Sequence, residues 1–372
     1  MRAALWGLTP TMGFGLACAS FTPDEGGQVD GLRTLTWTGS TGSDATIDLE
    51  VPVDGERGIL LSFEAEGSSM VFVNRVTSPS GEVVLDAETE WSSDENRTMA
   101  LYAAGVVSFN WPILPGDTLE AGTWEVEAVT TDAAGNYEGD VPVNFYGQLK
   151  GDDTLDNGLV HVDLVYVNGA GDEPDWVDAI EQASERWRAI YAEIGITVEF
   201  ESWTWDSGDL APPGYGNAQD YVAIAESTPF RSINLVITPE VAGQSDLYGI
   251  AGGIPGPLAA TATSAVTVSI STNAGPDLSF SSDEIRLLGE TMAHESGHFA
   301  GLFHPVEYAD GGWDNYDAVD DTQRCVGEGD CYAVLGENLM FPFPVCDDVS
   351  CDPQGDLTAG QGEVANRYTG VE

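Results

Sequence analysis

The stretch that decides the fold of this chain is Glu290–Pro305, "ETMAHESGHFAGLFHP". It holds three of the four histidines found among the 372 residues. His294 and His298 are four residues apart, so on a helix both imidazoles project from one face about one turn apart. Two neutral imidazoles placed in this way can bind one zinc ion from the same side, but they leave its coordination shell incomplete.

The residues around this pair predict where the helix begins and how a third ligand arrives. Ser281 is followed three residues later by Glu284, a capping-box arrangement that predicts a helix start ahead of the motif. Gly301 is the residue type that lets a helix end in a left-handed turn, after which His304 can return to the metal. Three histidines leave a fourth position for water.

Glu295 projects from the same side of the helix as His294 but is offset from it. Its carboxylate is therefore predicted to reach the water on the metal and to act as general base without binding the metal itself. In the alternative interpretation the paired histidines are ordinary surface residues. That alternative does not explain the complete HExxHxxGxxH spacing, in which chemistry accounts for every fixed position.

Two segments carry a resemblance to a known clan. "HESGHFAGLFH", residues 294–304, resembles the zinc motif of metzincin metallopeptidases, and "GENLMFP", residues 336–342, resembles their Met-turn with Met340 beneath the zinc. The order of elements from about Leu159 onward also resembles the clan's catalytic domain. The resemblance implies an α+β domain with a twisted mixed sheet, an active-site helix and a C-terminal subdomain with the Met-turn. It further implies an endopeptidase that binds Zn²⁺ through His294, His298 and His304 and uses Glu295 as its catalytic residue. Pro342 departs from the pattern, because several metzincins have an oxyanion-binding tyrosine there.

Within the clan the chain resembles the pappalysin-like group. The resemblance is carried by "GLFHPVE", "DDTQRC", the cysteines that flank the Met-turn and the terminal "LTAGQGEVANRY". It implies disulfides Cys325–Cys346 and Cys331–Cys351, which would clamp the His304 loop to the Met-turn. From the residues alone, these four cysteines predict two disulfides in any of three pairings, with a structural zinc site as the alternative.

The loop after His304, "EYADGGWDNYDAVDDT", is rich in aspartate. Clustered carboxylates suit Ca²⁺, although the spacing is not that of an EF-hand. Pappalysin-like enzymes bind calcium in this region, so the resemblance implies a structural calcium site in the Asp310–Asp321 loop. The alternative is a group of solvated aspartates. The five residues are Asp310, Asp314, Asp317, Asp320 and Asp321.

Two domains are predicted. Residues 22–150 read as an all-β sandwich or jelly roll, because short alternating apolar segments recur there between Pro and Gly turns. The polar stretch Gln148–Gly158 marks the boundary, and residues 151–372 form the predicted peptidase domain. In it, "LVHVDLVYVN", "TVEFESW", "SINLVIT" and "SAVTVSIS" are predicted strands. A helix from Pro174 to Gly195 is predicted from an apolar stripe with alternating spacings of four and three residues. The lone His161 is expected to be a satisfied strand residue.

The first 21 residues resemble an export signal, with Arg2 followed by a mostly apolar stretch. Cys18 makes this a candidate lipoprotein signal, and the alternative is an ordinary signal peptide. The protein is therefore expected to be secreted, extracellular or lipid-anchored at the bacterial cell surface. Its formal charge of −50 excludes nucleic acid as a partner.

The function expected from these features is a secreted or surface-tethered zinc endopeptidase. Its partner would be a protein or peptide substrate that binds as an extended strand beside "GIAGGIPGPLAATATSAVTVSIS", residues 249–271. The alternative is a surface adhesion or carbohydrate-binding lipoprotein with a structural or vestigial zinc site. A further alternative makes the N-terminal sandwich an inhibitory pro-segment.

Overall fold

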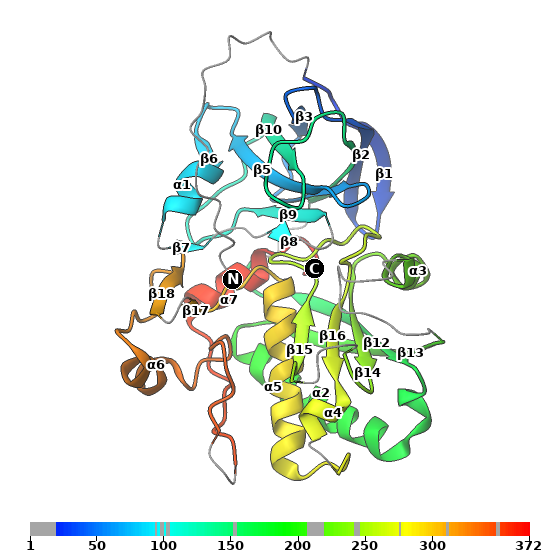
Figure 1. The fold of residues 1–372 in the computed structure, drawn as a ribbon, viewed down its shortest axis with the longest axis vertical. Helices are drawn as coiled ribbons and strands as arrows, with labels where there is room; N and C mark the ends of the chain where they lie inside the picture. Colours follow the sequence, from blue (N-terminus) through cyan, green and yellow to red (C-terminus); the bar gives the residue numbers. More distant parts are fainter. Residues whose placement is uncertain are drawn as a thin grey trace.

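The computed structural model describes residues 20–93, 95–96, 100–101, 105–151, 155–206, 219–241, 246–274, 277–309, 312–346 and 350–372. Most of the predicted signal segment, including Cys18, lies outside these ranges, as does Asp310. Across the described ranges the protein combines helices with several sheets, so the prediction of a mixed α+β protein is confirmed (Figure 1). None of the described helices is long and apolar enough to cross a membrane.

The N-terminal part contains two sheets, drawn in blue through cyan to blue-green in Figure 1. One has six strands in the order β1-β2-β11-β4-β9-β8, and the other has four in the order β3-β10-β5-β6. Buried side chains of both sheets form one hydrophobic cluster that includes Phe63, Phe109, Trp124 and Phe145. The strand bounds are β1 Asp24–Val29, β2 Leu32–Ser40, β3 Thr46–Val53, β4 Gly58–Ala65, β5 Met70–Thr77, β6 Val83–Asp86, β8 Ala100–Leu101, β9 Val106–Trp111, β10 Gly122–Thr131 and β11 Pro142–Lys150.

One element of this part departs from the all-β prediction. The short helix α1 (Ala87–Ser92) follows β6, and the side chain of Asp86 accepts a hydrogen bond from Thr89 N at its start. Six residues are too few to show a helical repeat in the sequence, which is why the alternating pattern did not reveal it. That residues 22–150 form a separate sandwich domain stays a prediction.

A five-stranded sheet underlies the predicted catalytic part. Its order is β13-β12-β14-β16-β15, and β15 alone runs antiparallel to its neighbour. The pattern-based strands are recovered as β12 (Leu159–Val167), β13 (Thr197–Trp205), β14 (Ser232–Thr238) and β16 (Val266–Ser269). The edge strand is β15 (Gly249–Ala251), and shorter elements are η1 (Ala170–Asp172), α3 (Gln219–Ser227) and α4 (Ile270–Ala274).

Two long helices, α2 (Pro174–Glu193) and α5 (Ser282–Phe299), pack against each other and share a buried cluster with this sheet. The predicted capping box is present, because Ser281 accepts from Glu284 N while the Glu284 side chain accepts from Ser281 N. The predicted stripe of α2 is largely buried, with Ile180 and Trp187 fully inaccessible. Gly289 of α5 lies against α2, because a Cβ atom at this position would lie 2.5 Å from the carbonyl oxygen of Ala183.

The chain beyond α5 forms a small sheet and two helices. β17 (Val306–Ala309) pairs with β18 (Gly312–Asp317), and β18 pairs in parallel with β7 (Glu95–Asn96) of the N-terminal part. The helices are α6 (Glu328–Leu335) and α7 (Ala359–Arg367). The segment that follows His304 is thus joined by strand pairing to the N-terminal part of the protein.

The C-terminal residues 367–371 form buried hydrogen bonds with the N-terminal part of the protein. Lys150, the only lysine in the chain, is fully buried, and its Nζ donates to the carbonyl of Val371 at 2.5 Å. Asn110 in β9 donates to the Arg367 carbonyl at 3.1 Å and accepts from Thr369 N at 3.0 Å. These buried polar contacts join β9 and β11 to the residues after α7.

The prediction of two disulfides is confirmed, but the pairing implied by the family resemblance is wrong. The bonds are Cys325–Cys331 and Cys346–Cys351. Each joins cysteines that are close in sequence: the first spans the start of α6, and the second links two facing residues of an isolated antiparallel bridge. The loop that carries His304 is therefore not clamped to the Met340 turn by a disulfide.

Candidate metal centre and catalytic carboxylate

The three histidines of the motif come together although they arise from two different segments. His294 and His298 lie on the last two turns of α5, and His304 lies in the chain that follows it. Nitrogen atoms of the three rings all lie within 4.8 Å of one another, and the Nε2 atoms of His298 and His304 are 3.1 Å apart. Gly301 makes the return possible, because its φ of +98° lies in the left-handed region.

The outward-facing nitrogen of each ring has its own hydrogen-bond acceptor. His294 Nδ1 lies 2.6 Å from the carbonyl oxygen of Leu339, and His298 Nδ1 lies 2.6 Å from that of Leu302. His304 Nδ1 lies 2.9 Å from Glu307 Oε2. Since carbonyl and carboxylate oxygens can only accept, each ring carries its proton on Nδ1, which leaves the Nε2 lone pairs free to bind a metal.

The protonation states of the two helical histidines also suit a metal. Burial, together with the neighbouring His304, lowers the pKa of His294 to about 3, and the hydrogen bond to Leu339 opposes this shift. Burial likewise holds the pKa of His298 well below its usual value. Both rings are therefore neutral near pH 7, and neutral imidazole is the form that binds zinc. This donor set of three neutral, oriented imidazoles fits Zn²⁺.

Glu295 lies beside the edge strand β15. A Cβ atom on Gly249 would lie 2.7 Å from Glu295 Cγ, and the main chain of Ala251 hydrogen-bonds to the carboxylate. Burial raises the pKa of Glu295 to about 7, against the opposing effects of His304 and of the Ala251 hydrogen bond. A carboxyl group with such a pKa can both take up and release a proton near neutral pH.

Met340 lies against the helix that carries the first two histidines. It is fully buried, and a Cβ atom on Gly297 would lie 2.7 Å from its Sδ. The preceding residue, Leu339, supplies the carbonyl that accepts from His294. The turn is closed by Asn338, whose carbonyl accepts from Phe341 N and whose side chain accepts from Met340 N. Its identity with the Met-turn of metzincins stays a prediction.

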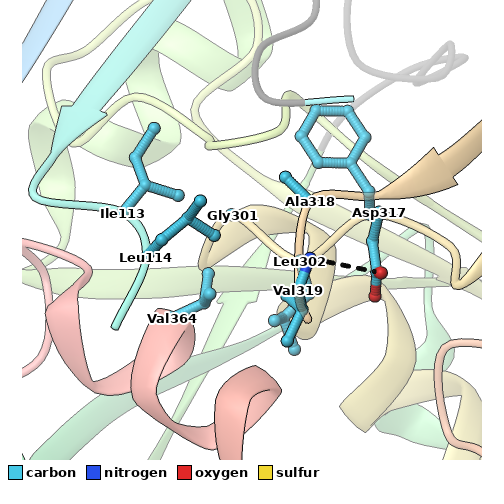
Figure 2. Close-up of a pocket in the computed structure, with 9 residues that line it drawn as sticks. Ile113, Leu114, Gly301, Leu302, Asp317, Ala318, Val319 and Val364 are labelled. Atoms are coloured by element: carbon cyan, nitrogen blue, oxygen red, sulfur yellow. Dashed lines mark hydrogen bonds between the residues drawn. The ribbon is translucent and has the colours of Figure 1, made fainter. Parts of the chain in front are cut away.

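A small pocket lies behind the turn that follows α5 (Figure 2). Ile113 and Leu114, from the segment after β9, face Gly301 and Leu302 across it. Leu302 provides the carbonyl that accepts from His298. At this pocket, residues of the N-terminal part therefore lie next to the residue that orients a candidate metal ligand. The dashed line in Figure 2 marks the 3.4 Å hydrogen bond from Val319 N to Asp317 on its far side.

The described aspartates of the acidic loop do not form a metal group. Asp317 is buried and accepts from Thr322 Oγ1 at 3.0 Å, and burial raises its pKa to about 7. Asp321 accepts from Thr358 and from Gly360 N, at the start of α7. Within the described ranges only the three histidines come together as a group of metal-binding side chains. Calcium binding here stays a prediction, since Asp310 lies outside the described residues.

His161 lies in β12, apart from this centre. Its ring nitrogens are 3.7 Å from Glu199 and 3.9 Å from Glu372, and its side chain is 40% exposed. The expectation of a half-buried strand histidine is confirmed, but these two contacts are longer than hydrogen bonds, so the expectation that its neighbours satisfy the ring stays a prediction.

The chain was compared with protein families, curated proteins and solved structures, and only solved structures match it. No family model and no curated protein matches the chain. Among solved structures, the archaemetzincin from Methanopyrus kandleri is 15% identical, covering 56% of this chain and 87% of its own, with a TM-score of 0.28. Metalloproteinase-II from Bacteroides fragilis is 14% identical, covering 41% of this chain and 45% of its own, with a TM-score of 0.25. At these TM-scores neither likeness establishes a shared fold or activity.

Proposed function

We propose that this protein is a zinc-dependent endopeptidase. The single observation that carries the proposal is the convergence of three histidine Nε2 atoms, each with its Nδ1 committed to an acceptor, next to the unliganded carboxylate of Glu295. When bound, a zinc ion would polarise a substrate carbonyl and make water a stronger nucleophile. Three protein ligands are the number typical of catalytic zinc, whereas structural sites usually use four.

In this proposal Glu295 moves the proton. Its carboxylate takes a proton from the attacking water as the new carbon–oxygen bond forms. It then delivers that proton to the amide nitrogen as the carbon–nitrogen bond breaks. The pKa of about 7 supports both steps, because neither protonation state of Glu295 is strongly favoured at neutral pH.

The same proposal gives the substrate a place along β15. This strand lies at the end of the five-stranded sheet and borders Glu295. An extended peptide that pairs with it would place one of its carbonyl groups near the histidines. We propose on the sequence features alone that the enzyme is exported or lipid-anchored through Cys18, and that the acidic loop binds calcium.

Zinc analysis combined with Glu295→Gln tests the proposal. We expect about one tightly bound zinc per chain in both proteins, and a loss of peptide cleavage of about 10²–10⁴-fold in the variant. Glu328→Gln, an equal change on the exposed start of α6, serves as the control and should cleave normally. Less than one tightly bound zinc per chain, or full activity of zinc-loaded Glu295→Gln, contradicts the proposal.

A further inference from the structure

His304 differs from the other two candidate ligands in what holds its Nδ1. Main-chain carbonyls accept from His294 and His298, whereas a side chain, Glu307, accepts from His304 at 2.9 Å. We propose that Glu307 is the positioning residue of the metal centre, fixing the tautomer and direction of the His304 ring and so setting the affinity for the metal. This inference rests on the proposed zinc site.

His304 needs such a partner more than the other two histidines do. His294 and His298 are fixed by the backbone of α5, whereas His304 follows the left-handed turn at Gly301. Its side chain is 21% exposed, so water can reach it. With the proton on Nε2 instead, His304 would direct an N–H at His298 Nε2, 3.1 Å away, and would offer no lone pair to a metal.

The strand pairing of β17 fixes the place of Glu307. Glu307 lies opposite Asp314 of β18, and β18 is itself paired to β7. The cross-strand neighbour is another acid, so the pairing of the strands brings no favourable charge to Glu307. The protonated Nδ1 of His304 supplies the donor, and the short sheet holds the carboxylate where it can accept.

The chemistry of this contact sets the expected magnitude. A histidine that donates to a carboxylate is a stronger ligand, and loss of such a partner typically lowers metal affinity by about 10–100-fold. Glutamine keeps an oxygen that can accept from Nδ1 but loses the charge. We therefore expect Glu307→Ala to weaken zinc binding by about 10–100-fold and Glu307→Gln to retain part of the affinity.

Zinc affinity of the full chain, measured by competition with a chromophoric chelator, tests the inference. The metal-free proteins are first compared by urea unfolding, so that a loss of folding is separated from a loss of affinity. The absorption spectrum of the Co²⁺-loaded protein then reports whether the ligand geometry changes in Glu307→Ala and recovers in Glu307→Gln. Glu226→Gln, on the exposed face of α3, is the charge-matched control and should bind zinc like the parent.

The outcomes are separable from those of the proposed function. If the parent protein binds no zinc, the metal centre itself is wrong. If the parent binds zinc but Glu307→Ala binds it within about twofold of the parent, only the positioning role is overturned. Should Glu307→Ala be destabilised as well, the glutamine variant decides, and an affinity no better than that of Glu307→Ala contradicts the role.

Discussion

Gly289 is the position where one added methyl group tests the packing of the two long helices. In Gly289→Ala the new Cβ would lie 2.5 Å from the carbonyl oxygen of Ala183 and 2.8 Å from Arg186 Cβ. Ordinary contact begins near 3.4 Å, so α2 and α5 must separate by roughly 0.9 Å. The neighbouring hydrogen bond from Tyr191 Oη to the Ala293 carbonyl, 3.0 Å long, would weaken as they do.

Two opposing effects decide the sign of this change. Alanine favours the helix over glycine by about 1 kcal/mol. Overpacking costs about 1–3 kcal/mol, and a weakened buried hydrogen bond adds about 1 kcal/mol. We therefore expect Gly289→Ala to lower the free energy of unfolding by about 1–3 kcal/mol. Because α5 carries His294 and His298 while His304 lies beyond it, the variant should also bind zinc more weakly.

Urea unfolding of the metal-free proteins measures this effect without the stabilisation that bound zinc adds. Gly329→Ala is the matched control, since Gly329 lies in α6 and its added Cβ would meet nothing within 4 Å. It should be neutral or stabilising by up to about 1 kcal/mol. If Gly289→Ala were as stable as the control, α2 and α5 could not be packed as closely as described.

Three further perturbations test other contacts. In Gly297→Ala the new Cβ would lie 2.7 Å from Met340 Sδ, so this variant should be less stable than the parent. In a Met340→Ala background the same change should instead be stabilising by up to about 1 kcal/mol, because alanine favours the helix over glycine. Additive effects of the two substitutions in urea unfolding would refute the contact. Lys150 should escape acetylation in the native protein and react only after unfolding, as read by peptide mass spectrometry; modification of the folded protein would contradict its burial against Val371. Burial raises the pKa of Asp317 from 3.8 to about 7 in the folded protein. The protonated carboxyl group therefore stabilises the fold fully below pH 3.8, and this stabilisation is lost as the pH rises to about 7, because the unfolded chain releases the proton first. With chelator present, the stability of Asp317→Asn relative to the parent should therefore increase between pH 3.8 and about pH 7, by at most about 4 kcal/mol. A difference in unfolding free energy that does not change with pH would contradict the raised pKa of Asp317.

The sequence predicted the parts of the site that depend on local signals. The capping box at Ser281, the four-residue spacing of His294 and His298, and the glycine at position 301 each specify a conformation within a few residues. A helix, its end and the return of His304 follow from such short-range rules. The strands β12, β13 and β14 were recovered for the same reason, because β12 and β14 contain buried apolar runs and β13 begins with alternating apolar and polar residues.

The hydrogen-bond acceptors of His294 and His298 could not be predicted from the sequence, because they are main-chain carbonyls and not side chains. The carbonyls of Leu339 and Leu302 accept from His294 and His298, but every residue has a carbonyl, and only the fold selects these two. Glu307 was visible in the quoted "GLFHPVE". Its spacing of three from His304 does not by itself show that β17 would turn the carboxylate back toward the ring.

The disulfide pairing failed for a different reason. Four cysteines allow three pairings, and the choice depends on which of them approach within bonding distance after folding. Cys325 and Cys331 bring their Cα atoms to 4.9 Å at the start of α6, a closeness that local geometry alone provides. The family resemblance favoured long-range links, and the local pairs of the structure leave the His304 loop to be held by other means.

The N-terminal part of the chain holds the segment after His304 through strand pairing. β7 pairs with β18, which in turn pairs with the strand that carries Glu307. Leu114 faces Leu302, the acceptor for His298, across the small pocket. A removable inhibitory segment would be expected to cover the three histidines, whereas these contacts reach Leu302 and the strand of Glu307, which support two candidate ligands. This placement favours an N-terminal part that helps to hold the metal centre in shape.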